Sequence, residues 1–170
     1  MAPIVTRGWA KRGCTPSVYQ RTRSHEKVSV IAAICVSPDR KRVKLFFALY
    51  QKHNINSTTI CEFLKQLKRH IRAHIMLVWD RLKAHISKQT KKFFGKHVRI
   101  HPILLPPYAP ELNPVECFWS YLKTKPLANF APEDIENLYK AALHAGRSVQ
   151  RKEILLRSFI KHSGLPLRLI

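Results

Sequence analysis

Residues 104–123, LLPPYAPELNPVECFWSYLK, carry the strongest structural signal in the chain. An apolar run ends at Leu105, and the prolines that follow exclude a helix and favour an extended turn. Asn113 is a favoured N-cap residue, and Pro114 is favoured at the first position of a helix. Beyond it, apolar side chains recur at helical spacing: Val115, Phe118, Trp119 and Leu122. The stretch therefore predicts a strand end, a proline-rich loop and an amphipathic helix with Glu116 in its first turn.

The position of Glu116 has two interpretations. Its spacing from Asn113 matches a capping box, in which the Glu side chain accepts a hydrogen bond from the backbone N–H of the N-cap residue. The alternative involves Asp80, which ends the apolar run Leu77–Trp79 and is separated from Glu116 by 35 residues. Carboxylates at a strand end and a helix start can converge on divalent metal ions, because hard cations prefer oxygen ligands. The local pattern favours the cap, whereas the second carboxylate favours a metal site.

The whole sequence predicts a single α/β domain over residues 1–170, in which strand-like and amphipathic runs alternate. The predicted strands are Val28–Val36, Val43–Tyr50, Ile75–Trp79 and Val98–Leu105, with Met1–Val5 and Ser17–Gln20 as short candidates. One predicted helix begins at Asn56-Ser57. Three others cover Ser87–Phe94, Pro132–His144 and Gln150–Lys161. The first two long strands flank Ser37-Pro38-Asp39 and should pair as a hairpin, and the strand, helix, strand order that leads to Ile75–Trp79 suggests a parallel sheet. Gly95 is expected to be a C-cap.

The composition favours a polyanionic partner. The chain has 31 Lys and Arg against 10 Asp and Glu, a formal net charge of +21, and 45% hydrophobic residues. So large a positive charge favours nucleic acid over membrane, while the apolar content argues against disorder. No apolar run reaches the ~18 residues of a transmembrane helix, and Met1–Arg12 lacks the apolar core of a signal peptide. The expected location is the cytoplasm.

The four cysteines favour neither a zinc site nor a disulfide framework. Both would require closely paired or denser spacing than the sequence shows. Cys35 and Cys61 lie in apolar runs, so we expect reduced thiols in the core.

Several motifs together resemble one enzyme family. They are VWDRLKAH around Asp80, LPPYAPELNPVE leading into FWSYLK, Gly8–Gly13 with Thr15-Pro16, and Leu127–Phe130. Over nearly the whole chain the sequence resembles the DDE transposases of bacterial insertion sequences, relatives of the mariner group. This resemblance implies an RNase H-like mixed sheet flanked by helices, with three acidic residues that hold two Mg²⁺ or Mn²⁺ ions. It makes Asp80 the second acid and Glu116 the third, with Glu111 a weaker candidate.

The sequence departs from the family pattern at the first acid. In the family this Asp ends the first strand, upstream of the Gly-Trp segment, and Met1 is too close to Trp9 to include it. Asp39, the only other Asp before Asp80, lies in a turn. We therefore expect the first strand to be missing or incomplete. The two-metal site should form only when another segment, such as one from an upstream reading frame, supplies the Asp.

The resemblance implies metal-dependent cleavage of DNA and strand transfer during transposition, by a chain that is inactive alone. Transposon ends and target DNA are the expected partners, a homodimer is compatible with the sequence, and the nucleoid of a bacterial cell is the expected location. A non-catalytic basic DNA-binding protein or regulator derived from a transposase is the alternative. An RNA-binding protein would explain the charge but not the spacing of the two acids.

Additional DNA contacts are expected at His85, Arg81, Tyr108, Lys11 and Arg12. His85 follows Asp80 by five residues, where the family usually has a His, although a helix-start His bonded to backbone fits equally well. Arg81 stands where many relatives have Asn. Tyr108 is the favoured ring for stacking on an unpaired base, because Trp119 shares the apolar pattern of its helix and is expected in the core.

Overall fold

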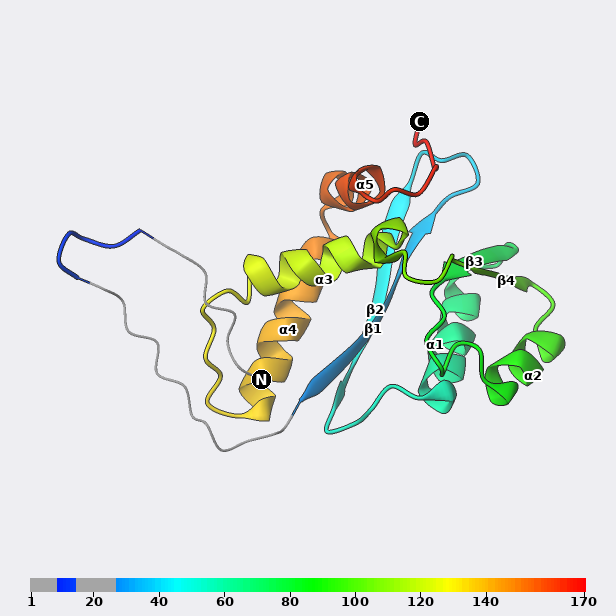
Figure 1. Cartoon of the computed structure of the whole chain (residues 1–170), viewed down its shortest axis with the longest axis horizontal. Helices are drawn as coiled ribbons and strands as arrows, with labels where there is room; N and C mark the ends of the chain where they lie inside the picture. The colour runs from blue at the N-terminus through cyan, green and yellow to red at the C-terminus, as the bar shows by residue number, and fades with distance from the viewer. Residues whose placement is uncertain (1–8, 15–26) are drawn as a thin grey trace.

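The structure is a computed structural model that describes residues 9–14 and 27–170 (Figure 1). The elements follow in the order β1 (Val28–Val36), β2 (Val43–Gln51), α1 (Ser57–His70), β3 (Ile75–Trp79), α2 (Lys88–Lys96), β4 (Ile100–Leu104), the 3₁₀ turn η1 (Pro110–Leu112), α3 (Pro114–Thr124), α4 (Ile135–Gln150) and α5 (Glu153–His162). This order confirms the predicted α/β class. The strand candidates at Met1–Val5 and Ser17–Gln20 lie outside the described residues.

The strands form two separate pairs. β1 is antiparallel to β2 as a hairpin, with Val28 opposite Gln51 and Val36 opposite Val43. The predicted hairpin is confirmed, whereas the parallel pairing joins β3 to β4 across α2 rather than joining β3 to the strand before α1. Within the described part of the chain, β1 pairs with no strand except β2, and β3 with none except β4. Each pair therefore has a second edge, on β1 and on β3, that no described strand covers.

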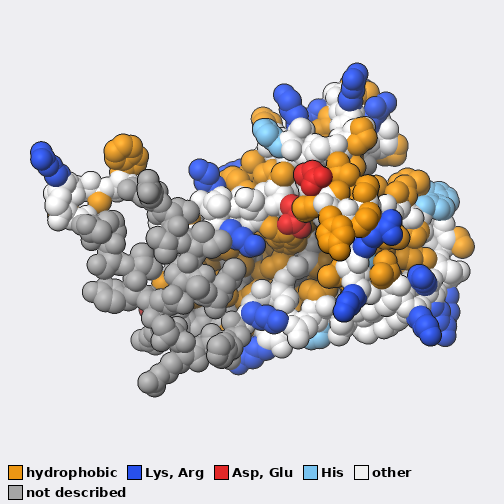
Figure 2. All heavy atoms as spheres, viewed as in Figure 1, with side chains coloured by type: hydrophobic (Ala, Val, Ile, Leu, Met, Phe, Trp, Pro, Cys, Tyr) orange, Lys and Arg blue, Asp and Glu red, His pale blue; other side chains and the backbone are white. Residues whose placement is uncertain are grey.

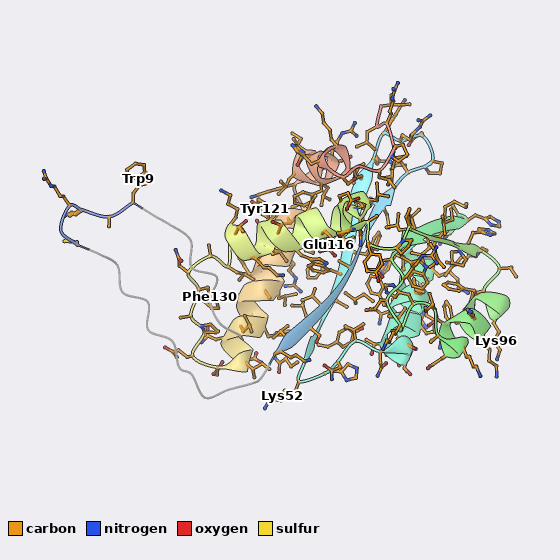
Figure 3. The ribbon with its side chains drawn as sticks, in the orientation of Figure 1. Trp9, Lys52, Lys96, Glu116, Tyr121 and Phe130 are labelled. Atoms are coloured by element: carbon orange, nitrogen blue, oxygen red, sulfur yellow. The ribbon has the colours of Figure 1, made fainter. Side chains whose placement is uncertain are left out.

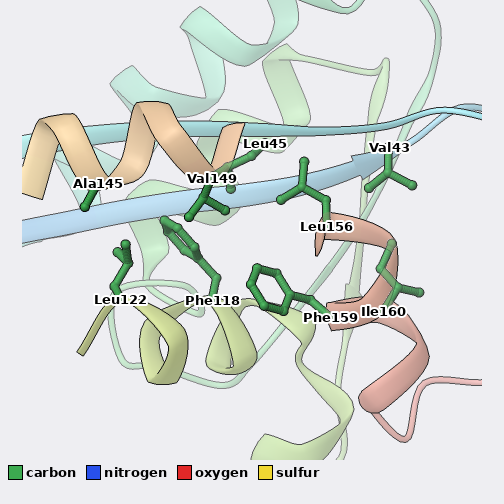
Figure 4. Close-up of a cluster of buried hydrophobic side chains, with 9 residues drawn as sticks. All are labelled: Val43, Leu45, Phe118, Leu122, Ala145, Val149, Leu156, Phe159 and Ile160. Carbon is green, nitrogen blue, oxygen red and sulfur yellow. The ribbon is translucent and has the colours of Figure 1, made fainter. Parts of the chain in front are cut away.

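Helices cover the two pairs in separate groups (Figure 1). α3, α4 and α5 lie against the β1–β2 hairpin, whereas α1 and α2 lie beside β3 and β4. The first group encloses a core of Val43, Leu45, Phe118, Leu122, Ala145, Val149, Leu156, Phe159 and Ile160 (Figure 4). The second core contains Ile60, Cys61, Leu64, Leu67, Ile75, Trp79, Phe93 and Ile100. No helix in the described ranges is long and apolar enough to cross a membrane.

β1 contributes side chains to both cores, as expected for a strand covered on both faces. Ala32, Ile34 and Val36 pack against the first core. Ile31, Ala33 and Cys35 pack against the second. This alternation follows from the two-residue period of a strand, which directs successive side chains to opposite faces. β1 therefore lies between the two cores and contributes one face to each.

Three helix-boundary predictions are wrong. Gly95 is not a C-cap: it lies within α2, and the backbone N–H of His97, the actual C-cap, donates to Phe94 O at 2.9 Å. The helix predicted from Pro132 begins at Ile135, because the Asp134 carboxylate accepts from the Asn137 N–H and acts as the N-cap. That helix also continues to residue 150, so the last helix begins after it rather than at Gln150.

Gly146 lies where α4 approaches the β1–β2 hairpin most closely. A Cβ at this position would be 2.6 Å from the Phe47 ring, which is inside contact distance. Gly→Ala in a helix ordinarily stabilises by about 0.5–1 kcal/mol, but overpacking costs about 1–3 kcal/mol. We therefore expect Gly146→Ala to lower the free energy of unfolding in urea. The matched control is Gly95→Ala in α2, where nothing lies within 4 Å and stability should rise. A rise in both variants would disprove the close approach of α4 to Phe47.

Candidate active site

Asp80 lies immediately after β3, at the carboxyl end of the parallel β3–β4 pair. Its Oδ1 accepts a hydrogen bond from the Leu82 backbone N–H at 2.9 Å and lies 2.7 Å from His85 Nδ1. The Asp80 side chain is 50% exposed, and within the described residues Oδ2 has no hydrogen-bond partner. The protein thus holds one carboxylate oxygen and leaves the other for a ligand.

His85 supports Asp80 from the turn between β3 and α2. Its ring stacks on Trp79, with 4.2 Å between the ring centroids and 14° between the planes. With a proton on Nδ1, the ring donates to the Asp80 carboxylate and lies 3.3 Å from the Asp80 carbonyl oxygen. α2 begins three residues later, at Lys88, so His85 lies before the helix start, while the expected contact with backbone is present at the Asp80 carbonyl oxygen. His85 also bonds to the carboxylate after β3 and restricts its orientation.

Glu116 is exposed in the first turn of α3. Asn113 is the N-cap, as predicted, and its side chain accepts from the Val115 N–H at 3.2 Å. The capping-box interpretation is wrong, because the Asn113 backbone N–H donates to Pro110 O at 3.0 Å instead of to Glu116. The η1 turn thus satisfies the donor that the Glu side chain would otherwise have capped. No hydrogen bond or ion pair within the described residues occupies the Glu116 carboxylate.

Asp80 directly follows β3, and Glu116 follows the loop that leaves the end of β4. Parallel strands end at the same edge, where the Leu105 N–H donates to Trp79 O at 2.8 Å. The proline-rich loop leaves from this edge and leads to α3, whose first turn with Glu116 lies on the side of β3 and β4 (Figure 3). Asp and Glu oxygens suit Mg²⁺ and Mn²⁺. However, the described residues contain no group of three His, Cys, Asp or Glu that could hold a metal ion. The ligands fit the metal in type but not in number.

Tyr108 stands out on the loop between β4 and α3. Its side chain is fully exposed, and its backbone has a φ of 57°, which is unfavourable for a bulky aromatic residue. Unfavourable backbone conformations cluster at ligand-binding sites, where they contribute to function. The exposed ring and the backbone conformation of Tyr108 agree with stacking on DNA, which stays a prediction.

The other predicted contacts have different surroundings. Arg81 Nε donates to Leu105 O at 2.9 Å, which ties the residue after Asp80 to the end of β4. Lys11 and Arg12 are exposed in the short described segment 9–14. Trp119 is partly buried against the first core, as expected. The roles of Arg81, Lys11 and Arg12 in DNA binding stay predictions.

The cysteines follow their predicted roles. All four are free thiols; Cys61 is buried and Cys35 partly buried. Burial raises the pKa of the Cys35 thiol to about 12, so it is protonated at neutral pH. Neither residue offers a reactive thiolate to a metal or an electrophile.

Sequence reasoning missed the supporting role of Trp79, which it identifies only as the last residue of a strand. The available signal was the five-residue spacing from Asp80 to His85, which allows a turn to bring the imidazole back over the strand end. The stack additionally restricts the ring that bonds to Asp80, so the carboxylate orientation depends on both aromatic side chains.

The fold is similar to chains in two solved structures. The Mos1 strand transfer complex matches with a TM-score of 0.56 and 15% identity, over 98% of this chain and 52% of that chain. The Mos1 mariner paired end complex with Mn matches with a TM-score of 0.56 and 12% identity, over 99% of this chain and 53% of that one. At these identities the likeness concerns the fold, and it confirms the predicted RNase H-like class. The chain spans about half the length of these relatives.

Among curated proteins, the sequence has no match. The profile of the DDE superfamily endonucleases matches residues 2–139, a range that includes Asp80, His85 and Glu116. The match covers most of the 170 residues and extends from before β1 into α4. It agrees with the motifs around both acids and with the two Mos1 folds. The chain therefore belongs to the DDE superfamily endonucleases.

Proposed function

We propose that this chain is the catalytic domain of a transposase that cleaves DNA and joins DNA strands with divalent metal ions. The observation that carries the proposal is Asp80, a strand-end carboxylate with one oxygen held by Leu82 and His85. Glu116 supports it, since its carboxylate is exposed and has no described partner. The family assignment and the fold shared with the Mos1 strand transfer complex support the same reaction.

Asp80 and Glu116 would hold Mg²⁺ or Mn²⁺ through their carboxylate oxygens. Bound in pairs, such ions activate an attacking water or 3′-hydroxyl and stabilise the leaving oxygen of a phosphodiester. The Leu82 N–H and His85 keep Asp80 in one orientation during this reaction. The third acidic ligand would come from a strand ending in Asp that is supplied in addition to these 170 residues. Without that strand the chain is expected to be inactive.

A plasmid-nicking assay with Mg²⁺ or Mn²⁺ tests this function. The chain alone should not nick, whereas the chain joined to an apolar strand ending in Asp should. Asp80→Asn and Glu116→Gln should each abolish that activity. The matched control is Glu111→Gln, an exposed carboxylate of η1, which should retain it. If the bare chain nicks the plasmid and Asp80→Asn abolishes this nicking, the chain does not need a third ligand. No nicking by the extended chain would refute catalysis.

DNA binding is expected to weaken steeply with salt. Each phosphate contact contributes about 0.9 to the slope of log K against log salt, because counterions are released. For about six contacts, affinity falls about 1,000-fold between roughly 50 and 200 mM salt. The +21 net charge supplies enough cations for such a footprint. Fluorescence anisotropy with a labelled duplex gives the slope, and an affinity insensitive to salt would contradict electrostatic binding.

One observation favours a second candidate, a non-catalytic DNA-binding protein or regulator. The described residues form no group of three potential metal ligands. The two candidates differ in the nicking assay with the added strand. Salt-dependent DNA binding without nicking in that assay would support the regulator.

A further inference from the structure

The positive charge of the chain is concentrated in one part of the fold. Residues 63–99, which include most of α1, β3 and α2, contain eleven Lys and Arg but a single acid, Asp80. Residues 111–153, which include α3 and α4, contain six Lys and Arg and six Asp and Glu. Residues 63–99 therefore carry a net +10 of the chain's +21, whereas residues 111–153 are neutral overall.

α1 and α2 run side by side in the same direction. Near their starts, Gln89 Nε2 donates to Thr58 Oγ1 at 3.0 Å. Near their ends, Lys68 Nζ lies 3.0 Å from His97 Nδ1. Both helices turn apolar side chains inward to the second core. Their exposed cations consequently share one outer surface, the α1–α2 face, consisting of Lys65, Arg69, Lys88, Lys91, Lys92 and Lys96.

His97 shows how closely these cations gather. Its ring packs on Phe93, with 4.2 Å between the centroids. Burial lowers the pKa of His97, and the positive charges of Lys68, Lys65 and Lys96 lower it further. Cations from two helices thus act on one imidazole, and no acid is close enough to be among the causes. Such a cluster is costly unless an anion offsets it.

We propose that the α1–α2 face binds the phosphate backbone of duplex DNA as a site separate from Asp80 and Glu116. Figure 3 places Lys96 at the far end of α2, away from Glu116 on α3. In Figure 2, Lys and Arg side chains line the edge of the molecule over α1 and α2. The acidic side chains that are visible in this view lie near its centre. This proposal rests on one part of the proposed function, namely that the chain binds DNA. It does not depend on whether the chain cleaves DNA.

The composition of the face favours a duplex over other polyanions. Within the described residues, no large hydrophobic or aromatic side chain of α1 or α2 is among the exposed ones. Single-stranded nucleic acid is bound largely by stacking on exposed rings, and membrane surfaces are bound by helices with an apolar side to insert. Cations alone on rigid helices suit backbone contacts that carry no sequence information. The face would therefore hold DNA of any sequence.

The test compares two variants that lose the same charge. One replaces Lys88, Lys91, Lys92 and Lys96 by Gln. The control replaces Lys123, Lys125, Arg151 and Lys161 by Gln; all eight residues are exposed. For the α2 variant we expect the salt slope for a duplex to fall by about 2–4, at about 0.9 per lost contact. For the control we expect a change below about 1. Circular dichroism melting checks that both variants fold.

Equal losses in both variants would overturn the proposal, because net charge alone would then explain binding. An unchanged slope in the α2 variant would overturn it as well, since DNA would bind elsewhere. If the parent chain does not bind duplex at all, the DNA partner of the proposed function fails instead. A larger loss of affinity in the α2 variant for an RNA hairpin, single-stranded DNA or anionic vesicles than for the duplex would reject duplex as the ligand.

As a second readout, NMR titration should show the pKa of His97 rising when duplex is added to the parent chain. If the pKa of His97 does not change when duplex is added, the α1–α2 face does not bind it.

Discussion

Adding a strand that pairs with the open edges of β1 and β3 is expected to raise the thermal midpoint of this chain by roughly 10 °C. In the described part of the structure each of these strands is paired on one edge only. A strand between them would form backbone hydrogen bonds on both sides, each with a net value of about 0.5–1.5 kcal/mol. Ordering the added residues offsets much of this gain. A remaining gain of about 3 kcal/mol corresponds to roughly 10 °C for a domain of this size.

The measurement compares the bare chain with a chain extended at its N-terminus by a linker and an apolar strand ending in Asp. The control extension has proline in the middle of that strand, because proline cannot donate to a strand ladder. Only the uninterrupted strand should raise the midpoint. Identical midpoints for all three proteins would show that the edges of β1 and β3 do not accept a strand. The same extended chain serves in the nicking assay, so stability and activity are measured on one protein.

Replacing Phe118 by alanine is expected to lower the free energy of unfolding by about 3–5 kcal/mol. The side chain is fully buried in the first core, with its ring centroid 6.4 Å from that of Phe159 on α5. It anchors α3 two residues after Glu116, so its loss also loosens the helix that presents this carboxylate. Urea denaturation gives the magnitude. The control is Ile154→Ala, an 86% exposed position of α5, for which we expect a change within about 0.5 kcal/mol. A Phe118→Ala effect no larger than that of Ile154→Ala would mean that α3 does not depend on this core.

The sequence predicted best where one local signal was strong. The continuous apolar run of β1 indicated a strand covered on both faces, and Asn113 indicated an N-cap that the structure contains. A strand, helix, strand order indicated parallel pairing, but the partner of β3 is the strand after α2 rather than the strand before α1. These predictions hold because strand period, capping and crossover topology depend on few residues.

Predictions failed where a distant group competed for the same atom. Glu116 was a plausible cap for Asn113 until the fold brought Pro110 O to that N–H through the η1 turn. Gly95 fits either the interior or the end of a helix, and only His97 decides between them. The link from Asp80 through His85 to Trp79 requires a turn whose path the sequence does not specify. The candidate acids were therefore predictable as residues, but the contacts that orient or release them were not.

The shared position of β1 makes the cooperativity of this molecule depend on one strand. Alternate side chains of β1 belong to different cores, Ile34 to the first and Ile31 to the second. Neither half can melt without exposing one face of β1, and each exposed face weakens the strand that supports the other half. Both cores should consequently unfold in a single transition. Amide hydrogens of β1 that donate to β2 should then exchange only through global opening, the slowest exchange of the chain.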